Sequence, residues 1–279
     1  MNVALRPLLA GLLLGRAAAA GDPDLSKPPA LQPGSRIVFL IGEEEYNTAE
    51  TLPEFAKRDL EPRGFKVTLL QDQPTNRGSF AGLAEALAQA DVLFISVRRR
   101  ALPRLQLEAI RAHLDAGKPL IGIRTASHAF APRDKEREEL VVKDGRAEWP
   151  RFDPEVLGGN YQGHHGAGTR TLVTAATGAA GHPILAGVET ATFHSPGSLY
   201  RVSPLAPSAT VLLIGSIPGE AAEPVAWVNT YGPKHARVFY TSLGHPDDFG
   251  QPMFRQLLLN GLIWALDPQA AHRRPAPAR

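Results

Sequence analysis

The stretch "DVLFISVRRRALPRLQLEAIRAHLDAGKPLIGI", residues 91–123, places two apolar runs of strand length on either side of a helical pattern. In its centre, Leu107, Ile110 and Leu114 recur at the three- and four-residue spacing of one helix face. Gly117 follows as a helix terminator. Runs that are apolar at nearly every position are typical of parallel strands buried on both faces. This strand–helix–strand unit predicts an α/β fold.

The same alternation continues on both sides of this unit. Strands are predicted at 36–41, 66–71, 91–97 and 119–123, with helices at 51–64, 79–90 and 102–118. The second half is less regular, with strands predicted at 169–175, 209–215, 224–229 and 236–242 and a closing helix at 252–266. We therefore expect a single α/β domain over 36–268, with a mostly parallel sheet and helices on both faces.

The two ends of the chain differ from this domain in composition. Residues 1–20 resemble a signal peptide: Arg6 precedes a short apolar core, and small residues precede Gly21. The segment is too short to span a bilayer as a helix, although retention as an anchor stays open. We expect a signal peptide at 1–20, a Pro-rich linker at 21–35 and a disordered tail at 269–279. The mature protein is then exported, periplasmic or extracellular, without a stable membrane span.

Charge and cysteine content exclude several classes of function. Five of the 30 basic residues lie in the first 20 or the last 11 positions, which hold none of the 28 acidic residues, so 21–268 carry a net charge of −3. A nucleic-acid binder normally has a basic folded domain, and we exclude that class. The chain has no cysteine, which excludes a cysteine nucleophile, a thiolate zinc site and iron–sulfur chemistry.

Polar loops follow three of the predicted strands: "GEEEYNTAE" (42–50), "RRRALP" (98–103) and "RTASHAF" (124–130). Because ligands bind at the carboxyl ends of the strands in open α/β sheets, these loops should converge. The candidate substrate-binding residues here are Glu43, Glu44, Tyr46, Arg98 and Arg99, and the candidate catalytic residues are Arg124 and His128.

Two of these groups have alternative explanations. The acidic run is either a solvated turn or a binder of sugar hydroxyls or a metal. The arginine run, which includes Arg100, either fixes an anionic group or pairs with those acids.

Two further loops contain histidines. "GGNYQGHHGAG" (158–168) contains Tyr161, His164 and His165 among five glycines, and "YTSLGHPDDF" (240–249) contains His245 and Asp247. Glycines let the backbone and an imidazole approach a ligand closely. We predict His164 and His245 as catalytic acid–base groups or as ligands of a divalent metal such as zinc. The alternative for the glycine loop is a flexible surface segment.

A family likeness is carried by the ordered set "GIRTASHAF", "GGNYQGHH", "GHPILAGV", "EPVAWVNTYG" and "RVFYTSLGHPDDF". Over residues 36–266 the chain resembles the trehalose-utilisation (ThuA-like) family, in particular its exported, planctomycete-type branch. The resemblance implies a class I glutamine amidotransferase-like (flavodoxin-like) fold. Similar amidotransferases have a cysteine after the strand that corresponds to 119–123, and its absence here argues against a glutaminase.

The resemblance also implies roles for individual residues. It marks Tyr161, His164, His182 and His245 as family positions, and we expect His164 in a pocket. Tyr161, as a platform for a sugar, His182 and Asp247 are further candidate substrate-binding residues. His182, in a Gly-His-Pro sequence, could equally be a structural turn. Many relatives have a histidine where this chain has Arg124, so that we expect Arg124 to contribute a fixed positive charge.

These observations lead to three hypotheses on function. The first is an exported enzyme that acts on a disaccharide or a 3-keto-glycoside by histidine-based, metal-assisted or metal-free acid–base chemistry, as a lyase, isomerase or hydrolase. No Gly-x-Gly-x-x-Gly sequence follows the first strand, which argues against dinucleotide redox chemistry. The second is a sugar-binding module without catalysis, and the third a metal-dependent hydrolase of another substrate.

Overall fold

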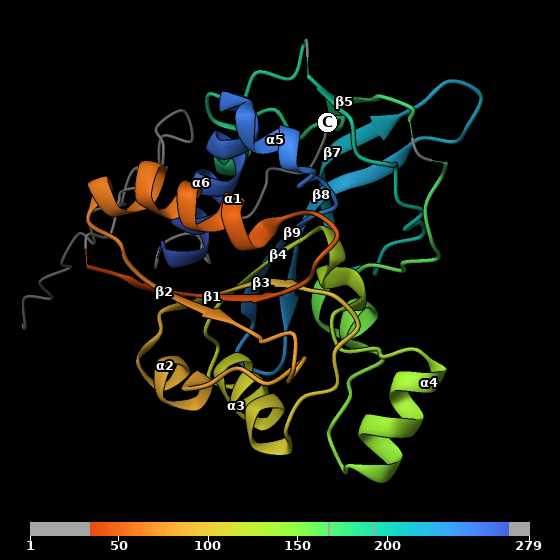
Figure 1. The fold of residues 1–279 in the computed structure, drawn as a ribbon. Coiled ribbons are helices and arrows are strands. Elements are labelled where there is room, and N and C mark those ends of the chain that lie inside the picture. Colours follow the sequence, from red (N-terminus) through yellow and green to blue (C-terminus); the bar gives the residue numbers. More distant parts are fainter. Residues whose placement is uncertain (1–33, 167, 192, 268–279) are drawn as a thin grey trace, which may run out of the picture.

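The computed structural model describes residues 34–166, 168–191 and 193–267 (Figure 1). The predicted signal peptide, nearly all of the predicted linker and the predicted tail lie outside these residues. The described residues form a nine-stranded sheet in the order β2-β1-β3-β4-β9-β8-β7-β5-β6. The strands are β1 (Arg36–Gly42), β2 (Lys66–Gln71), β3 (Val92–Val97), β4 (Leu120–Ile123), β5 (Thr171–Ala175), β6 (His194–Ser195), β7 (Thr210–Ser216), β8 (Glu223–Tyr231) and β9 (Ala236–Thr241).

The helices include several short 3-10 and π turns. The α-helices are α1 (Thr48–Phe55), α2 (Leu83–Gln89), α3 (Arg104–Asp115), α4 (Asp134–Glu136), α5 (Pro246–Gly250) and α6 (Pro252–Leu266). The π-helical segments are η1 (Ala56–Leu60), η4 (Arg137–Lys143) and η5 (Asp153–Leu157), and the 3-10 segments are η2 (Glu61–Arg63), η3 (Arg124–His128) and η6 (Pro183–Leu185). The predicted helix at 51–64 thus begins at Thr48, and the closing helix at 252–266 is confirmed.

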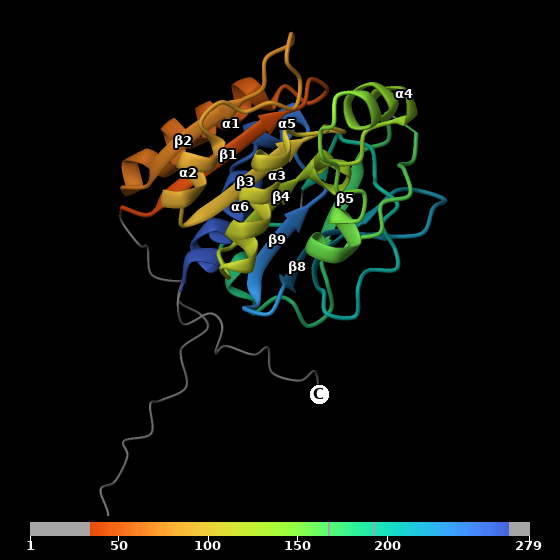
Figure 2. The ribbon, with the colours of Figure 1, turned by 90° about the horizontal axis from the view of Figure 1, so that it is seen from below.

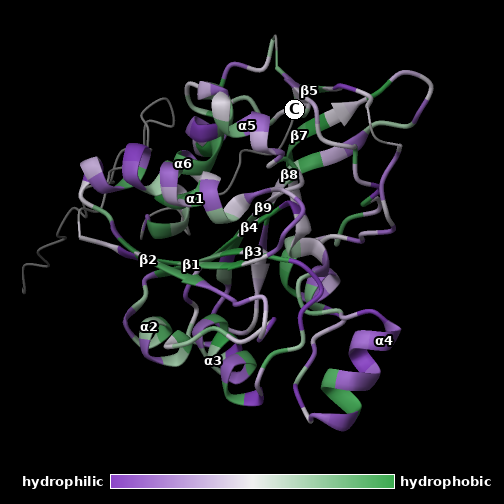
Figure 3. Ribbon diagram, viewed as in Figure 1, coloured by the Kyte–Doolittle hydropathy of each residue, from purple (hydrophilic) through white to green (hydrophobic). Residues whose placement is uncertain are grey.

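Helices cover both faces of the sheet, as predicted, and the alternation of side chains along β1 shows why. Ile37, Phe39 and Ile41 pack into one core with α1 and α6. Val38 and Leu40 point the other way and pack into a second core with α2 and α3. Figures 1 and 2 show these helix pairs on opposite faces, and Figure 3 shows the strands between them in the green of hydrophobic residues.

The sheet is mixed, so the prediction of a mostly parallel sheet is wrong. The pairs β2–β1, β1–β3, β3–β4 and β4–β9 are parallel, whereas β9–β8, β8–β7, β7–β5 and β5–β6 are antiparallel. The reason is connection length: only residues 232–235 join β8 to β9, and only 217–222 join β7 to β8. A parallel crossover needs about a dozen residues or more, so these short connections force hairpins.

The parallel half has a switch point that locates the site. From β1 the sheet order continues to β2 on one side and to β3 on the other. In open α/β sheets such a point creates a crevice at the carboxyl ends of the two central strands. The loops after β1, β3, β4 and β9 therefore lie along one edge of the sheet.

Among the described residues, no helix combines the length and apolar character that a bilayer crossing requires.

Helix α6 packs against β9 at a glycine, which gives a test of the packing. A Cβ on Gly261 would collide with the ring of Phe239, which is fully buried. We expect Gly261→Ala to lower the free energy of unfolding by about 1–2 kcal/mol in chemical denaturation, because overpacking outweighs the helix propensity of alanine. The matched control is Gly250→Ala in α5, where a Cβ meets nothing within 4 Å. A neutral or stabilising Gly261→Ala would contradict this close contact.

Candidate functional site

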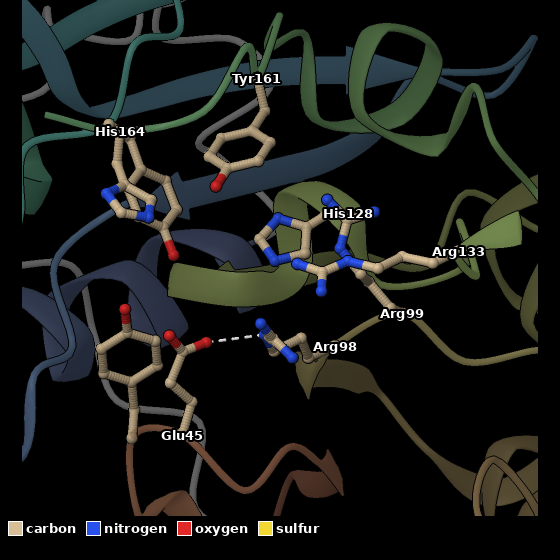
Figure 4. A pocket seen from close by; sticks show the side chains of 9 residues that line it. Glu45, Arg98, Arg99, His128, Arg133, Tyr161 and His164 are labelled. Atoms are coloured by element: carbon tan, nitrogen blue, oxygen red, sulfur yellow. Dashed lines mark ion pairs between the residues drawn. The ribbon is translucent and has the colours of Figure 1, made fainter. Parts of the chain in front are cut away.

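A polar hollow, here called the central pocket, lies at this edge of the sheet (Figure 4). Its cavity volume is about 50 Å³. A cavity needs about 10–15 Å³ to hold one water, so the central pocket has room for about four waters or one edge of a sugar ring. It is lined by Glu45, Tyr46, Arg98, Arg99, His128, Arg133, Tyr161, His164 and Tyr200.

The loop after β1 is organised by the carboxylate of Glu43, which is buried. One oxygen accepts the backbone N–H groups of Glu45 and Tyr46, each at 2.7 Å, and the other accepts from the backbone and hydroxyl of Thr48 at 2.8 and 2.5 Å. This carboxylate thereby caps the start of α1. With both oxygens occupied in this way, Glu43 directs Glu45 and Tyr46 into the central pocket and does not line it itself.

Two members of the arginine run after β3 pair with acidic side chains, which is one of the alternatives that the sequence left open. Arg98 forms an ion pair with Glu45 at 2.7 Å. Arg100, almost fully buried, contacts Asp72 at 2.7 Å and Glu44 at 3.1 Å. Glu44 also pairs with Arg77 and lies outside the central pocket.

Arg99, in contrast, pairs with no carboxylate among the described residues. It has a left-handed backbone at φ 51°, and its Nη1 donates to the carbonyl of Ala131 at 3.2 Å. Arg99 is therefore the member of the run whose charge stays available to a ligand.

Arg124 follows β4 in a left-handed conformation, φ 44°, and is 2% exposed. Its guanidinium lies between the rings of Tyr46 and Tyr200, 4.5 and 4.4 Å from their centroids. It donates to the carbonyls of Ser242 at 2.7 Å and Ser198 at 3.1 Å, and to the hydroxyl of Tyr46 at 3.2 Å. Arg124 thus lies behind two tyrosines of the pocket wall and acts on a ligand only through them.

His128 is nearly buried in the wall of the central pocket. Its ring stacks on Tyr161 with centroids 4.5 Å apart, and its Nδ1 lies 3.1 Å from Ser127 Oγ. Burial, followed by the charges of Arg99 and Arg98, lowers the pKa of His128 to about 2. The imidazole is therefore neutral at physiological pH, and its ring has one N–H donor and one acceptor nitrogen.

The two histidines of the glycine loop have different surroundings. His164 is exposed, lines the central pocket and stacks at 6.2 Å on Tyr200, with which it forms an isolated β-bridge. Its Nδ1 donates to the carbonyl of His165 at 2.8 Å, which leaves Nε2 as the free nitrogen of the neutral ring. His165 lies 3.6 Å from Glu220 and does not line the pocket.

The glycines at the start of this loop allow close packing. A Cβ on Gly159 would collide with the carboxyl of Asp153, and one on Gly158 would lie 2.8 Å from the amide of Asn229. Asp153 is buried, and its Oδ2 accepts the backbone N–H of Tyr161 at 2.7 Å. The glycine loop is thereby fixed at its base, and Tyr161 is held over His128.

The remaining predicted residues lie outside the central pocket. His245 caps α5: its Nδ1 accepts from the backbone N–H of Asp247 at 3.3 Å, and its ring lies 6.4 Å from that of Tyr46. Asp247 is exposed, 3.7 Å from the same Nδ1. His182 caps η6 and contacts Trp264 of α6 at 5.9 Å, and burial lowers its pKa to about 4.

The predicted metal ligands His164 and His245 are not joined by further ligands. Within residues 34–166, 168–191 and 193–267, no group of three or more histidine, aspartate or glutamate side chains is placed to hold a metal ion. A zinc site normally uses three or four protein ligands. Among the described residues, His164 and His245 therefore do not make up the ligand set of a zinc site.

Sequence reasoning missed four residues of the site: Glu45, Arg133, Tyr200 and Asp153. Glu45 belonged to the acidic run, but only the capping by Glu43 decides which acid turns inward. Arg133 had no sequence signal, because it lies in a segment without periodicity. Tyr200 reaches the pocket through its pairing with His164, a contact between distant parts of the chain.

Comparisons with known proteins bear on the family and the fold. The family model described as trehalose utilisation (ThuA) matches residues 37–265. A ThuA-like protein from Parabacteroides merdae has a similar structure, with a TM-score of 0.57 and 17% identity over 84% of this chain and 90% of that one. A β-galactosidase from Bacillus circulans sp. alkalophilus gives 0.51 and 10% over 86% of this chain and 32% of that one. At these identities the two structures are similar in fold alone. No curated protein matches this sequence.

Asp153 gives a testable pH dependence. Burial raises its pKa from 3.8 to about 7. The folded state then binds this proton more tightly than the unfolded state, so the contribution to stability is full below about pH 4 and is lost as the pH rises towards 7. Asp153→Asn retains an acceptor for Tyr161 but cannot ionise. We expect the fall in unfolding free energy from pH 5 to pH 8 to shrink by about 2 kcal/mol in this variant, measured by urea denaturation.

The exposed Asp134 offers a matched control. Asp134→Asn should retain the wild-type pH dependence. An Asp153→Asn variant whose stability still declines as steeply as that of the wild type would show that Asp153 is not the group responsible.

Proposed function

The chain belongs to the trehalose-utilisation (ThuA) family, and from this premise we propose an exported enzyme that acts on a disaccharide or a 3-keto-glycoside by histidine-based acid–base chemistry. The observation that carries the proposal is a pair of imidazoles in one polar pocket, the neutral His128 and His164 with its free Nε2. The doubly wound order β2-β1-β3-β4 further supports a flavodoxin-like, class I glutamine amidotransferase-like topology. Without a cysteine, glutaminase activity is no part of the proposal.

His164 is the general base in this proposal. The hydrogen bond from its Nδ1 to the carbonyl of His165 fixes the tautomer and orients the ring, as second partners of working histidines do. Nε2 takes the proton from the carbon next to the keto group, and the electron pair of the C–H bond moves to the carbonyl oxygen as an enolate. The glycine backbone on both sides lets a substrate approach this ring closely.

His128 serves the opposite role, as a hydrogen-bond donor. An imidazole that stays neutral can donate its N–H to the developing oxyanion without having to lose a charge, which is the role of the neutral histidine in triosephosphate isomerase. The guanidinium of Arg99, available on the same side of the pocket, adds positive charge next to that oxygen. Base and donor thus lie on different walls of one cavity, as proton abstraction beside a carbonyl requires.

Aromatic rings supply the surface for a sugar. Tyr161, Tyr200 and Tyr46 all line the central pocket, and Tyr161 is held between His128 and Tyr200 at centroid distances of 4.5 and 4.8 Å. The apolar C–H face of a sugar ring packs on such rings while its hydroxyls reach polar groups at the rim. The Tyr46 hydroxyl accepts from Arg124, so its own proton remains free for a ligand.

The test follows trehalose, sucrose and their 3-keto derivatives by proton NMR in the presence of the purified protein. We expect turnover of at least one of these sugars and at least a hundred-fold lower rate in His164→Ala, since a general base contributes about 10²–10⁴-fold. His165→Ala is the matched control, because it removes the neighbouring imidazole and keeps the backbone carbonyl that orients His164. Unchanged sugars with the wild type, or equal rates in the two variants, would reject the proposal.

The sugar-binding module remains the second candidate, favoured by the aromatic lining of the pocket. It predicts binding without turnover, and a His164→Ala variant that loses affinity rather than rate. Calorimetric titration of the same sugars, run beside the NMR assay, separates the two candidates.

Export is part of the proposal and rests on the apolar segment before Gly21. We expect the protein recovered from the periplasm or medium of an expressing bacterium to begin at Gly21, as read by N-terminal sequencing. An intact first segment on membrane-bound protein would indicate an anchor instead.

A further inference from the structure

We infer that Arg99 and Arg133 form an anion subsite beside the central pocket and that the substrate is a carbohydrate with a carboxylate or phosphate group. The inference rests on the proposed function, because the sugar itself is placed in the central pocket. It names a substrate class that the family's association with neutral disaccharides does not imply.

The geometry begins with a second hollow next to the first, here called the cationic hollow. It has a cavity volume of about 300 Å³ and shares Arg98, Arg99 and Arg133 with the central pocket. Its complete lining is Arg77, Arg98, Arg99, Arg100, Arg133, Lys135 and Glu136. Because the central pocket holds only one edge of a sugar ring, the rest of a bound substrate extends naturally into this larger space.

Three of the cations in this lining lack a carboxylate partner. Arg77 pairs with Glu136 and Glu44, and the partners of Arg98 and Arg100 are given above. Arg99, Arg133 and Lys135 form no ion pair with any described carboxylate. Arg99 and Arg133 lie beside His128 in Figure 4, and burial together with the charge of Arg133 lowers the pKa of Arg99. Two guanidiniums at one place repel each other unless an anion lies between them.

The fixed position of Arg99 distinguishes this site from a solvated basic face. Its backbone N–H donates to the carbonyl of His128 at 3.0 Å, its Nη1 donates to Ala131, and its backbone is in the left-handed region. Its Nε is buried and has no hydrogen-bond partner. A guanidinium that is held in place in this way is what a preorganised anion site provides.

The ligand chemistry follows from these groups. Guanidiniums bind carboxylates and phosphates through paired N–H donors. The domain as a whole carries a net charge of −3 over residues 21–268, so the positive region is local and suits a small anion rather than a polyanion such as nucleic acid. The anion next to His128 also places the sugar ring to which it is attached at the central pocket.

The experiment compares the affinity of three probes by isothermal titration: methyl glucoside, methyl glucuronide and glucose 6-phosphate. We expect one of the two anionic sugars to bind at least ten-fold more tightly than the glucoside, and the comparison of the two identifies carboxylate or phosphate as the group. Arg133→Gln should reduce this preference about ten-fold. The side chain of Arg133 is exposed and caps no helix, so the variant should fold.

Lys143→Gln provides the matched control, since it removes one positive charge from the adjoining helical segment and lies outside both hollows. It should retain the wild-type preference. Equal affinity for neutral and anionic sugars, or a preference that survives Arg133→Gln, overturns the inference and leaves the proposed function intact. If no sugar binds but inorganic phosphate does, with weaker binding in Arg133→Gln, the subsite stands and the carbohydrate function falls.

Discussion

The buried guanidinium of Arg124 connects the parts of the chain that make the site. It lies at the end of β4, yet its hydrogen bonds reach the loop after β1 at Tyr46, the segment at Ser198 and the end of β9 at Ser242. A buried charge needs compensation, and among the described residues no carboxylate pairs with it. Carbonyl oxygens, hydroxyls and two tyrosine rings compensate the charge instead. These groups come from three distant segments, so burying one cation fixes the geometry of the whole sheet edge.

The regular half of the fold could be predicted from sequence because local patterns determine it. Continuous apolar runs identified β1 to β4, and the 3.6-residue spacing identified α3 and α6. The direction of β7, β8 and β9 could not be read from their apolar pattern, because a strand buried in either kind of sheet can show it. Connection length held that information: residues 232–235 are too few for a crossover. Short segments such as η5 depend on tertiary contacts, here those of Asn229 with Val156 and Gly158.

For the site, the sequence predicted which loops meet but not which side chains turn inward. The rule that strand ends converge placed Tyr46, Arg98, Arg99 and His128 at one edge, and they do line one pocket. Among the three neighbouring glutamates, hydrogen bonding decides: Glu43 is used as a cap and Glu44 in ion pairs, which leaves Glu45. A single sequence cannot show which of the three glutamates turns into the pocket, since they have the same chemistry and adjacent positions.

The balance of charge at this edge of the sheet explains why His128 and His164 have different roles in the proposed reaction. The acids after β1 neutralise Arg98, Arg100 and Arg77, so the remaining positive charge of Arg99 and Arg133 acts on His128 without a counter-ion. That charge, added to burial, keeps His128 neutral and makes it a donor rather than a base. His164 lies exposed on a loop that enters from the antiparallel half, and a backbone carbonyl alone fixes its tautomer. The separation of donor and base therefore follows from the mixed sheet itself, because the parallel half provides the cations and His128 and the antiparallel half provides His164 and Tyr200.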